Sequence, residues 1–239
     1  MKKIFLIIYY FFNILFKKNK YKKISYSYGS VDLLLEHIFK NQSHGFYIDV
    51  GCQHPVMNNN TYLLYKKGWN GINIDLDKKN IDLFNFYRKR DLNLNFAISS
   101  QEGERDLFFY HDKSAINTVE KSVANYQKAQ VKEIKKVKTK TLNSIIENSK
   151  FNDLTIDFVS IDVEGHELDV IKGFDLKKYK PKVVIIEFLD LSLKKLEIKN
   201  LNIKNFLKSE IYQYMIDKNY TLVNLIHSDL VFVNNSFRD

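Results

Sequence analysis

The 239-residue chain contains few of the residues that break or cross-link a fold: two prolines, eight glycines and one cysteine, Cys52. A single cysteine excludes a disulfide framework and fits a reducing compartment, so we expect a cytoplasmic protein. Cysteine and histidine spacings typical of metal sites are missing, as are internal repeats. Because proline and glycine for a flexible linker are scarce while 45% of the residues are apolar, we expect one folded domain, over residues 29–239.

Acidic residues are absent from the first 23 positions. Seven lysines lie there: Lys2, Lys3, Lys17, Lys18, Lys20, Lys22 and Lys23. The formal net charge of the chain is +9, so the remainder carries only 9 − 7 = +2. A body so close to neutral lacks the electrostatic footprint of a duplex binder, and we expect no nucleic-acid partner.

A run of apolar residues long enough to cross a membrane is also missing. The longest, Ile4 to Phe16, is interrupted by Asn13 and would span about 20 Å as a helix, against roughly 30 Å for a hydrocarbon core. Lysines follow it in place of a small-residue cleavage site, which argues against a cleaved signal peptide. Two hypotheses remain for residues 1–28. The segment is an anchor lying on the inner leaflet through residues 1–23, or a terminal helix packed on the domain or on a partner.

Four apolar runs of strand length end in acids. They are Phe46 to Asp49 (followed by Gly51), Gly71 to Asp75, Asp157 to Asp162, and Lys182 to Glu187. The segments between them have helical spacing, which is typical of an α/β fold with a doubly wound, mostly parallel sheet. The four acids would then line one edge of the sheet. Because a structural sheet needs no carboxylates there, this pattern indicates a site.

The remaining pattern predicts further elements. Helices are expected over residues 31–38, 61–67, 78–90, 167–172 and, as one helix, 202–215; strands are expected over residues 93–98 and 106–110. Residues 220–226 and 230–233 predict an antiparallel hairpin on the sheet edge. The lysine-rich part of residues 112–140 has apolar residues at every third position and allows no assignment.

Asp75 lies where doubly wound folds hold the hydroxyl groups of a ribose. A carboxylate suits this role because its two oxygens accept from two vicinal hydroxyls. Gly51 would let the backbone N–H groups of the first turn approach a ligand. The full Gly-x-Gly-x-x-Gly fingerprint of dinucleotide sites is absent, since only Gly51 is present. These residues favour a nucleoside cofactor without a pyrophosphate, such as S-adenosylmethionine.

Longer motifs add a resemblance. They are Tyr47–Gly51, Gly68–Asp75, Asn95–Ile98, Thr141–Leu142 and Asp157–Gly173. With them, residues 30–190 resemble the FkbM-type family of S-adenosylmethionine-dependent methyltransferases, in particular the subgroup with an Asp-Val-Gly-Cys-x-His-Pro turn. The usual second glycine of that turn is missing, and His54-Pro55 stands in its place.

The resemblance implies a Rossmann-like class I methyltransferase fold and a set of roles. By it, Asp49 and Gly51 would lie against the methionine part of the cofactor, and Asp75 against its ribose. Ala97 and Ile98 would flank the adenine. Asp162 and Glu164 would lie at the reacting centre.

Methylation of a hydroxyl needs a base that removes its proton. The candidates are Asp162, Glu164, His166, Glu187 and His54, and Asp162 is favoured because it ends the strand nearest the first turn. A divalent metal shared by Asp162 and Glu187 is a less favoured alternative.

The expected function is methylation of an oxygen on a small-molecule or glycan acceptor. A sugar hydroxyl of a surface glycan or glycolipid is favoured because the family is frequently associated with polysaccharide biosynthesis and because the N-terminus is basic. Two alternatives remain open. One is a metal-dependent glycosyltransferase that uses Asp75-Leu-Asp77 as its acid pair; the other is a non-catalytic, membrane-associated binding module.

Overall fold

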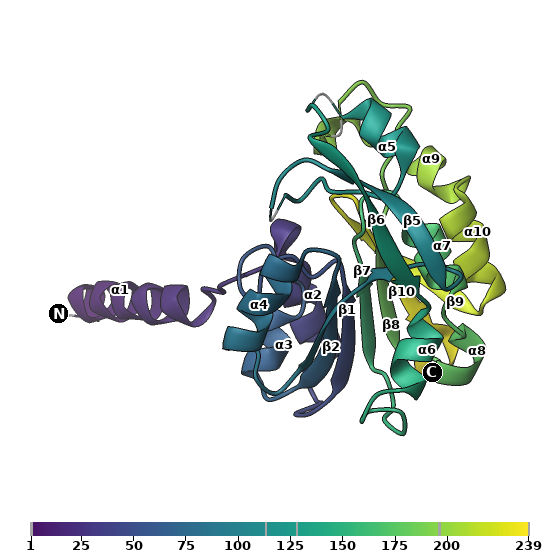
Figure 1. The fold of residues 1–239 in the computed structure, drawn as a ribbon. Helices are drawn as coiled ribbons and strands as arrows, with labels where there is room; N and C mark the ends of the chain where they lie inside the picture. Colours follow the sequence, from purple (N-terminus) through teal and green to yellow (C-terminus); the bar gives the residue numbers. More distant parts are fainter. Residues whose placement is uncertain (1, 113, 128, 196, 239) are drawn as a thin grey trace.

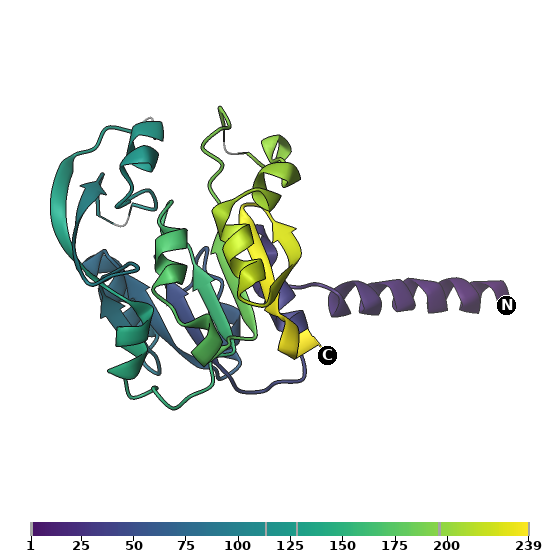
Figure 2. The same ribbon diagram turned by 90° about the vertical axis from the view of Figure 1, so that its right-hand side faces the viewer.

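The computed structural model describes residues 2–112, 114–127, 129–195 and 197–238. Its centre is a seven-stranded sheet with the strand order β3-β2-β1-β7-β8-β10-β9 (Figures 1 and 2). The strands are β1 (Phe46–Val50), β2 (Asn70–Asp75), β3 (Leu92–Asn95), β7 (Phe158–Ile161), β8 (Val183–Glu187), β9 (Tyr220–Ile226) and β10 (Asp229–Asn234). The first five of these pair in parallel, while β10 runs antiparallel to both β8 and β9. This confirms the predicted doubly wound sheet and its C-terminal hairpin.

Helices cover both faces of the sheet because its central strands are apolar on both sides. On one face, Tyr47 of β1 packs in a cluster with Val31, Leu35 and Leu64 from two helices. On the other, Ile48 of the same strand packs in the larger cluster that helices from the second half of the chain complete. The helices are α2 (Val31–Ile38), α3 (Tyr62–Lys66), α4 (Lys78–Tyr87), α5 (Lys121–Tyr126), α6 (Leu142–Glu147), α7 (Glu167–Lys172), α8 (Leu176–Tyr179), α9 (Ile203–Leu207), α10 (Glu210–Asp217) and α11 (Asn235–Arg238), with short 3-10 turns η1 (Tyr28–Ser30) and η2 (Ile198–Asn200).

A second, three-stranded sheet lies beside the first. Its order is β4-β6-β5, from β4 (Ala97–Ile98), β5 (Gly103–Phe109) and β6 (Glu133–Lys140). The single strand predicted over residues 93–98 is wrong, because the chain leaves the large sheet after Asn95 and continues in the small one. The lysine-rich segment is strand β6. Its apolar residues recur at every third position, and residues three apart lie on opposite faces of a strand. The spacing therefore allowed no strand assignment from the sequence.

The helix predicted over residues 202–215 is two helices. The chain breaks at Ser209, whose hydroxyl accepts a hydrogen bond from the N–H of Tyr212 at 3.2 Å and so caps α10. A serine offers the backbone this local alternative to continuing a helix. The helix expected over residues 78–90 ends at Tyr87.

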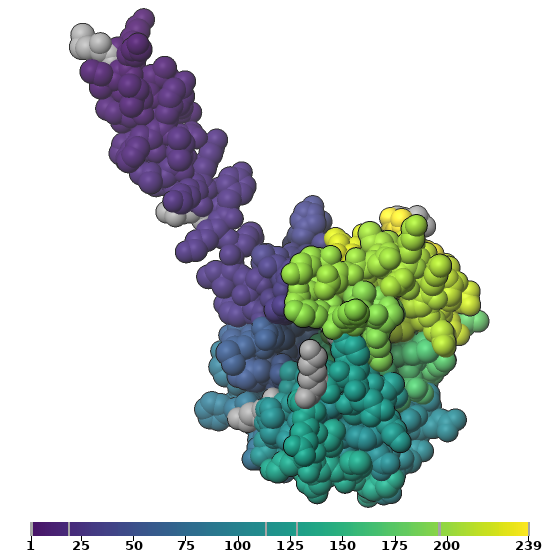
Figure 3. All heavy atoms as spheres, turned by 90° about the horizontal axis from the view of Figure 1, so that it is seen from above, coloured from purple at the N-terminus to yellow at the C-terminus, as the bar shows by residue number. Residues whose placement is uncertain are grey.

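The N-terminal segment forms α1 (Lys2–Lys20), which extends away from the rest of the molecule (Figures 1 and 3). The large apolar side chains from Ile4 to Phe16 are between 44% and 73% exposed. In this structure α1 is therefore not packed on the domain. Among the described residues, no helix combines the length and apolar content needed to cross a membrane.

Gly51, just past β1, has a φ of +82°, and a Cβ there would lie 1.6 Å from the carbonyl oxygen of Asp162. Gly68 has a φ of +97° but nothing within 4 Å of the same position. We expect Gly51→Ala to lower the free energy of unfolding by about 3 kcal/mol or more, because backbone must move. Gly68→Ala, the matched control, should cost only about 1–2 kcal/mol of conformational strain. Urea unfolding of both variants measures the two losses in the free energy of unfolding. Equal losses would contradict the role given to the close approach of Gly51, after β1, to the carbonyl oxygen of Asp162, after β7.

Candidate active site

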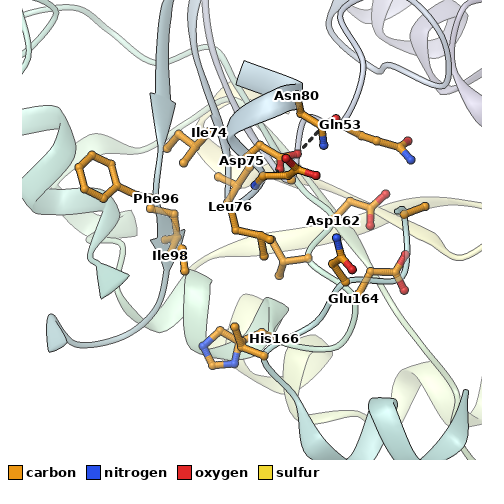
Figure 4. A pocket seen from close by; sticks show the side chains of 18 of the residues that line it. Gln53, Ile74, Asp75, Leu76, Asn80, Phe96, Ile98, Asp162, Glu164 and His166 are labelled. Atoms are coloured by element: carbon orange, nitrogen blue, oxygen red, sulfur yellow. Dashed lines mark hydrogen bonds between the residues drawn. The ribbon is translucent and has the colours of Figure 1, made fainter. Parts of the chain in front are cut away.

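A pocket opens at the carboxyl edge of the sheet, where β1, β2 and β7 end side by side (Figure 4). It contains about 700 Å³ of empty space, part of it open to solvent. Ser114, Ala115, Asn117 and Val119 complete the lining from the segment between β5 and α5. Of the site residues predicted from the sequence, seven line this pocket: Gly51, Asp75, Ala97, Ile98, Asp162, Glu164 and His166.

The carboxylate of Asp75 is held from both sides. Its Oδ1 accepts a hydrogen bond from the N–H of Asp77 at 2.7 Å, and its Oδ2 accepts one from the N–H of Gln53 at 2.9 Å. Burial raises its pKa to about 6, although these hydrogen bonds favour the charged form. Each oxygen keeps further acceptor capacity. Asp75 is thus a fixed, pocket-lining carboxylate that can accept from hydroxyl groups of a ligand.

The N–H groups of the first turn are already used. The N–H groups of Gly51 and Cys52 both donate to the carbonyl oxygen of Ile74, at 2.8 and 3.2 Å, and that of Gln53 donates to Asp75. These donors are therefore engaged within the protein in this structure, and the predicted contact of Gly51 with a ligand stays a prediction. Gly51 lines the pocket, and its lack of a side chain permits the close approach of Asp162 described above.

His54 organises the rest of this turn. Its Nδ1 accepts hydrogen bonds from the N–H groups of Val56 and Met57, at 3.1 and 3.0 Å. An imidazole nitrogen that accepts cannot carry a proton, so the ring presents its proton on Nε2. The histidine thus satisfies loop amides where the family's usual turn has a second glycine. It lies outside the residues that line the pocket.

Arg88, fully buried after α4, is a residue that the sequence reasoning missed. Its guanidinium donates to the carbonyl oxygen of Pro55 at 2.9 Å, to the hydroxyl of Tyr47 at 2.9 Å and to Oδ1 of Asn59 at 2.7 Å. The fork of an arginine reaches several acceptors at fixed angles, which suits the joining of β1 to its following loop. A lone basic residue at a helix end gives no signal of this role in one sequence.

Asp49 belongs to the same buried network and lies outside the pocket lining. Its Oδ2 accepts hydrogen bonds from Asn59 Nδ2 at 3.1 Å and from the hydroxyl of Thr61 at 2.9 Å. Burial raises its pKa to about 6. These contacts make Asp49 a support for the loop before α3, and its predicted contact with the methionine part of a cofactor stays a prediction.

One wall of the pocket is apolar. Leu76 follows β2, while Phe96, Ala97 and Ile98 come from the crossing between the two sheets. Ala97 and Ile98 were expected beside an adenine, and Phe96 was not. An apolar wall next to a carboxylate with free acceptor capacity would suit a nucleoside, whose base is apolar on its faces and whose ribose is polar.

Three carboxyl groups meet at the opposite wall. Oxygens of Asp162, Glu164 and Glu187 all lie within 4.8 Å of one another. Asp162 and Glu164 line the pocket, whereas Glu187 does not. Burial, with Asp162 nearby, raises the pKa of Glu164 to about 9 and that of Glu187 well above its usual range. At neutral pH Glu164 therefore holds a proton, which reduces the repulsion between like charges in a small space.

Asp229 joins this group and was missed in the sequence. It begins β10 and pairs with Glu187 across the antiparallel ladder. Burial and the charge of Asp162 raise its pKa to about 7. The signal was available: a hairpin returning antiparallel to β8 must place its first residue opposite the last residue of that strand.

The turn that carries Asp162 and Glu164 is held by Glu167. Its Oε1 accepts from the N–H groups of Val163 and Gly165, at 3.1 and 2.9 Å. Glu164 itself has a φ of +58°, a left-handed conformation that is uncommon for a residue with a side chain. Such conformations persist where the surroundings enforce them, and they gather at functional sites. The turn therefore presents Glu164 to the pocket at a conformational cost.

His166 is 2% exposed and has partners on both ring nitrogens. Nδ1 lies 2.5 Å from Oε1 of Glu120, and Nε2 lies 3.0 Å from the hydroxyl of Ser99. Neither nitrogen is available to take a proton from an acceptor in this structure. We interpret His166 as a positioning residue that joins α7 to the small sheet. Its ligand atoms, with those of Glu120 and Asp169, form a second group close enough to hold a metal ion.

A family model described as "Methyltransferase FkbM domain" matches residues 49–222, about three quarters of the chain. No curated protein sequence matches the chain. Among solved structures, the 16S rRNA methylase ArmA is similar at 14% identity and a TM-score of 0.38, over 85% of this chain and 80% of that chain.

The raised pKa of Glu164 predicts how stability depends on pH. Between its usual value of 4.5 and about 9, the folded protein binds more protons than the unfolded chain, so stability falls as pH rises through this window. We expect the ligand-free protein to melt at a lower temperature at pH 9 than at pH 6. Glu164→Gln, neutral at both values, should reduce the difference, whereas Glu102→Gln at an exposed loop should not. A wild-type melting temperature that rises with pH would refute the buried, protonated state.

Proposed function

The chain belongs to the FkbM methyltransferase family, and we propose that it transfers a methyl group from S-adenosylmethionine to an oxygen, a sugar hydroxyl of a surface glycan or glycolipid, in the cytoplasm. The observation that carries the proposal is one pocket with three properties. It combines the fixed carboxylate of Asp75, the apolar wall around Phe96 and the carboxyl groups of Asp162 and Glu164. These suit the ribose, the adenine and the positive sulfonium of the cofactor.

The carboxyl wall supports a cationic ligand in particular. Carboxyl oxygens of Asp162, Glu164 and Glu187 lie within 4.8 Å of one another, and Asp162 and Glu164 line the pocket. Carboxyl groups this close repel one another when ionised, and a cation bound beside them would offset that repulsion. When bound, S-adenosylmethionine supplies a methyl carbon activated by its sulfonium, and the positive charge would favour ionisation of the neighbouring carboxyl groups.

The protein has two tasks in such a transfer. The first is alignment, which can contribute on the order of 7–11 kcal/mol to an in-line displacement. The second is removal of the acceptor's proton, for which a positioned base contributes about 10²- to 10⁴-fold. Asp162 is the favoured base, because it ends the strand nearest the first turn and lines the pocket as an exposed carboxyl group. Glu164 is the second candidate, once a nearby cation lowers its pKa.

The glycosyltransferase alternative has less support. It needs Asp75 and Asp77 to converge on a metal ion, but Asp75 holds two backbone N–H groups and Asp77 caps α4 by accepting from the N–H of Lys79 at 2.8 Å. A non-catalytic module would keep the pocket and lack turnover.

Transfer of a labelled methyl group to fractionated cell envelope tests the proposed function. We expect label in the glycan or glycolipid fraction, with activity retained after EDTA because no metal is needed. Asp162→Asn should lower kcat by about 10²- to 10⁴-fold while the cofactor still binds. Cofactor binding without any transfer would favour the non-catalytic module. Activity lost in EDTA and restored by a divalent metal would favour metal assistance by Asp162, Glu164 and Glu187.

Calorimetry with S-adenosylmethionine tests the ribose contact. Asp75→Ala removes acceptors of charge-assisted hydrogen bonds, and we expect the Kd to rise about 10- to 100-fold. Asp82→Ala is the matched control. Asp82 is an exposed acid of α4, and its replacement should leave the Kd unchanged. Circular dichroism checks that Asp75→Ala still folds. A folded Asp75→Ala variant with wild-type affinity would rule out the contact.

Proton release on binding tests the carboxyl wall. At pH 8 Glu164, with a pKa of about 9, is mostly protonated, and a sulfonium beside it should expel that proton. Affinity should then rise with pH up to about 9, by at most tenfold per unit for one proton. Calorimetry in buffers of different ionisation enthalpy counts the protons released. Glu164→Gln should lower the count and Glu102→Gln should not; a wild-type count of zero would contradict the proposed placement of the sulfonium.

A further inference from the structure

Helix α1 is apolar around its whole circumference. Twelve of the thirteen residues from Ile4 to Phe16 are apolar or aromatic, and the remaining one is Asn13. At 3.6 residues per turn, such a run leaves no polar face. All twelve side chains are exposed in this structure. A helix of this kind needs apolar surroundings on every side, which a protein partner covering one stripe does not supply.

The charges at its ends identify the surroundings. Lys2 and Lys3 precede the apolar run, and five lysines from Lys17 to Lys23 follow it, with no acid in the segment. Like charges of this density would repel a second copy of the helix packed in parallel. They complement an anionic lipid leaflet in which the apolar run lies among the acyl chains while the lysines at its two ends reach the headgroups.

The link between α1 and the domain is short and fixed at its far end. Asp32 accepts hydrogen bonds from the hydroxyls of Ser25 and Ser27, at 2.6 and 3.0 Å, and from the N–H of Tyr26 at 2.7 Å. The carbonyl oxygen of Tyr26 accepts from the N–H of Asn59 at 3.0 Å. The chain between α1 and this anchored point, residues 21–24, reaches at most about 14 Å.

We propose that α1 inserts into the headgroup–acyl boundary of an anionic lipid leaflet and holds the domain against that surface. The lysines at both ends contact lipid phosphates, and the apolar run enters the acyl chains. The anchored point at Tyr26 bonds to Asn59 of the loop that supports β1, so the leaflet lies on the side of the molecule that carries this loop. The inference rests on α1 alone and does not depend on the proposed methyl transfer.

Flotation of the purified full chain with lipid vesicles tests the proposal. We expect the protein to float with phosphatidylcholine vesicles that contain phosphatidylglycerol. It should float much less with phosphatidylcholine alone, and less as salt is raised, because salt screens the lysines. Equal flotation with both vesicles would overturn the electrostatic part, and no flotation with either would overturn the whole proposal.

Variants separate the contribution of the apolar run of α1 to vesicle binding from that of its lysines. Ile7→Glu with Phe11→Glu should lower the partition coefficient about tenfold or more on anionic vesicles, because charges enter the acyl region. Ile203→Glu is the matched control: this isoleucine of α9 is 64% exposed, against 62% for Ile7, and its replacement should change nothing.

Charge reversal probes the lysines. Changing Lys17, Lys18 and Lys20 to Glu should weaken binding to anionic vesicles on the order of a hundredfold or more, at about 1 kcal/mol per lysine, and leave binding to neutral vesicles unchanged. Circular dichroism and thermal melting check that these variants fold as the wild type does, whether or not the vesicles bind. A protein that stays off vesicles and sediments as an α1-dependent dimer would assign the helix to a second copy instead.

Discussion

The close approach of backbone at the ends of β1 and β7 determines most of what surrounds the pocket. Gly51 lies so near the carbonyl oxygen of Asp162 that no side chain fits between them. The N–H of Asp162 also donates to the carbonyl oxygen of Val50 at 2.9 Å, and Gly51 donates across to β2. Three strand ends are thereby fixed against one another. The carboxylates of Asp75 and Asp162 face one cavity because of this contact.

The site also concentrates groups that repel each other. Burial and the nearby Asp162 raise the pKa values of Glu164, Glu187 and Asp229, whereas Asp162 itself is exposed in the pocket. Glu164 adds a left-handed backbone conformation. Neither arrangement helps the ligand-free fold, which is stabilised elsewhere by two apolar clusters on the faces of the sheet. A cationic cofactor would relieve the repulsion, so the cost to stability and the affinity for the ligand share one physical origin.

The folded domain and helix α1 differ in how their polar and apolar groups are accommodated. In the domain, nearly every polar group of the first turn is satisfied internally, by Ile74, Asp75 and His54. In α1 the apolar side chains stay exposed and the charges lie only at the ends. The first pattern is that of a preorganised pocket, and the second is that of a segment whose partner lies outside the chain.

Strand ends, helix periodicity and the acids beside them were readable from the sequence, because each depends on residues close together in the chain. The four strands ending in Asp49, Asp75, Asp162 and Glu187 and the antiparallel hairpin are confirmed, and the motifs around them were sufficient for the family. Which acids face the pocket was not readable. Asp49 is held in supporting contacts, Glu187 lies outside the pocket lining, His166 has both nitrogens occupied, and Arg88 was not predicted. The hydrogen bonds of Asp49, Arg88 and His166 join residues 10 to 67 positions apart, and only the folded chain decides which of them are made.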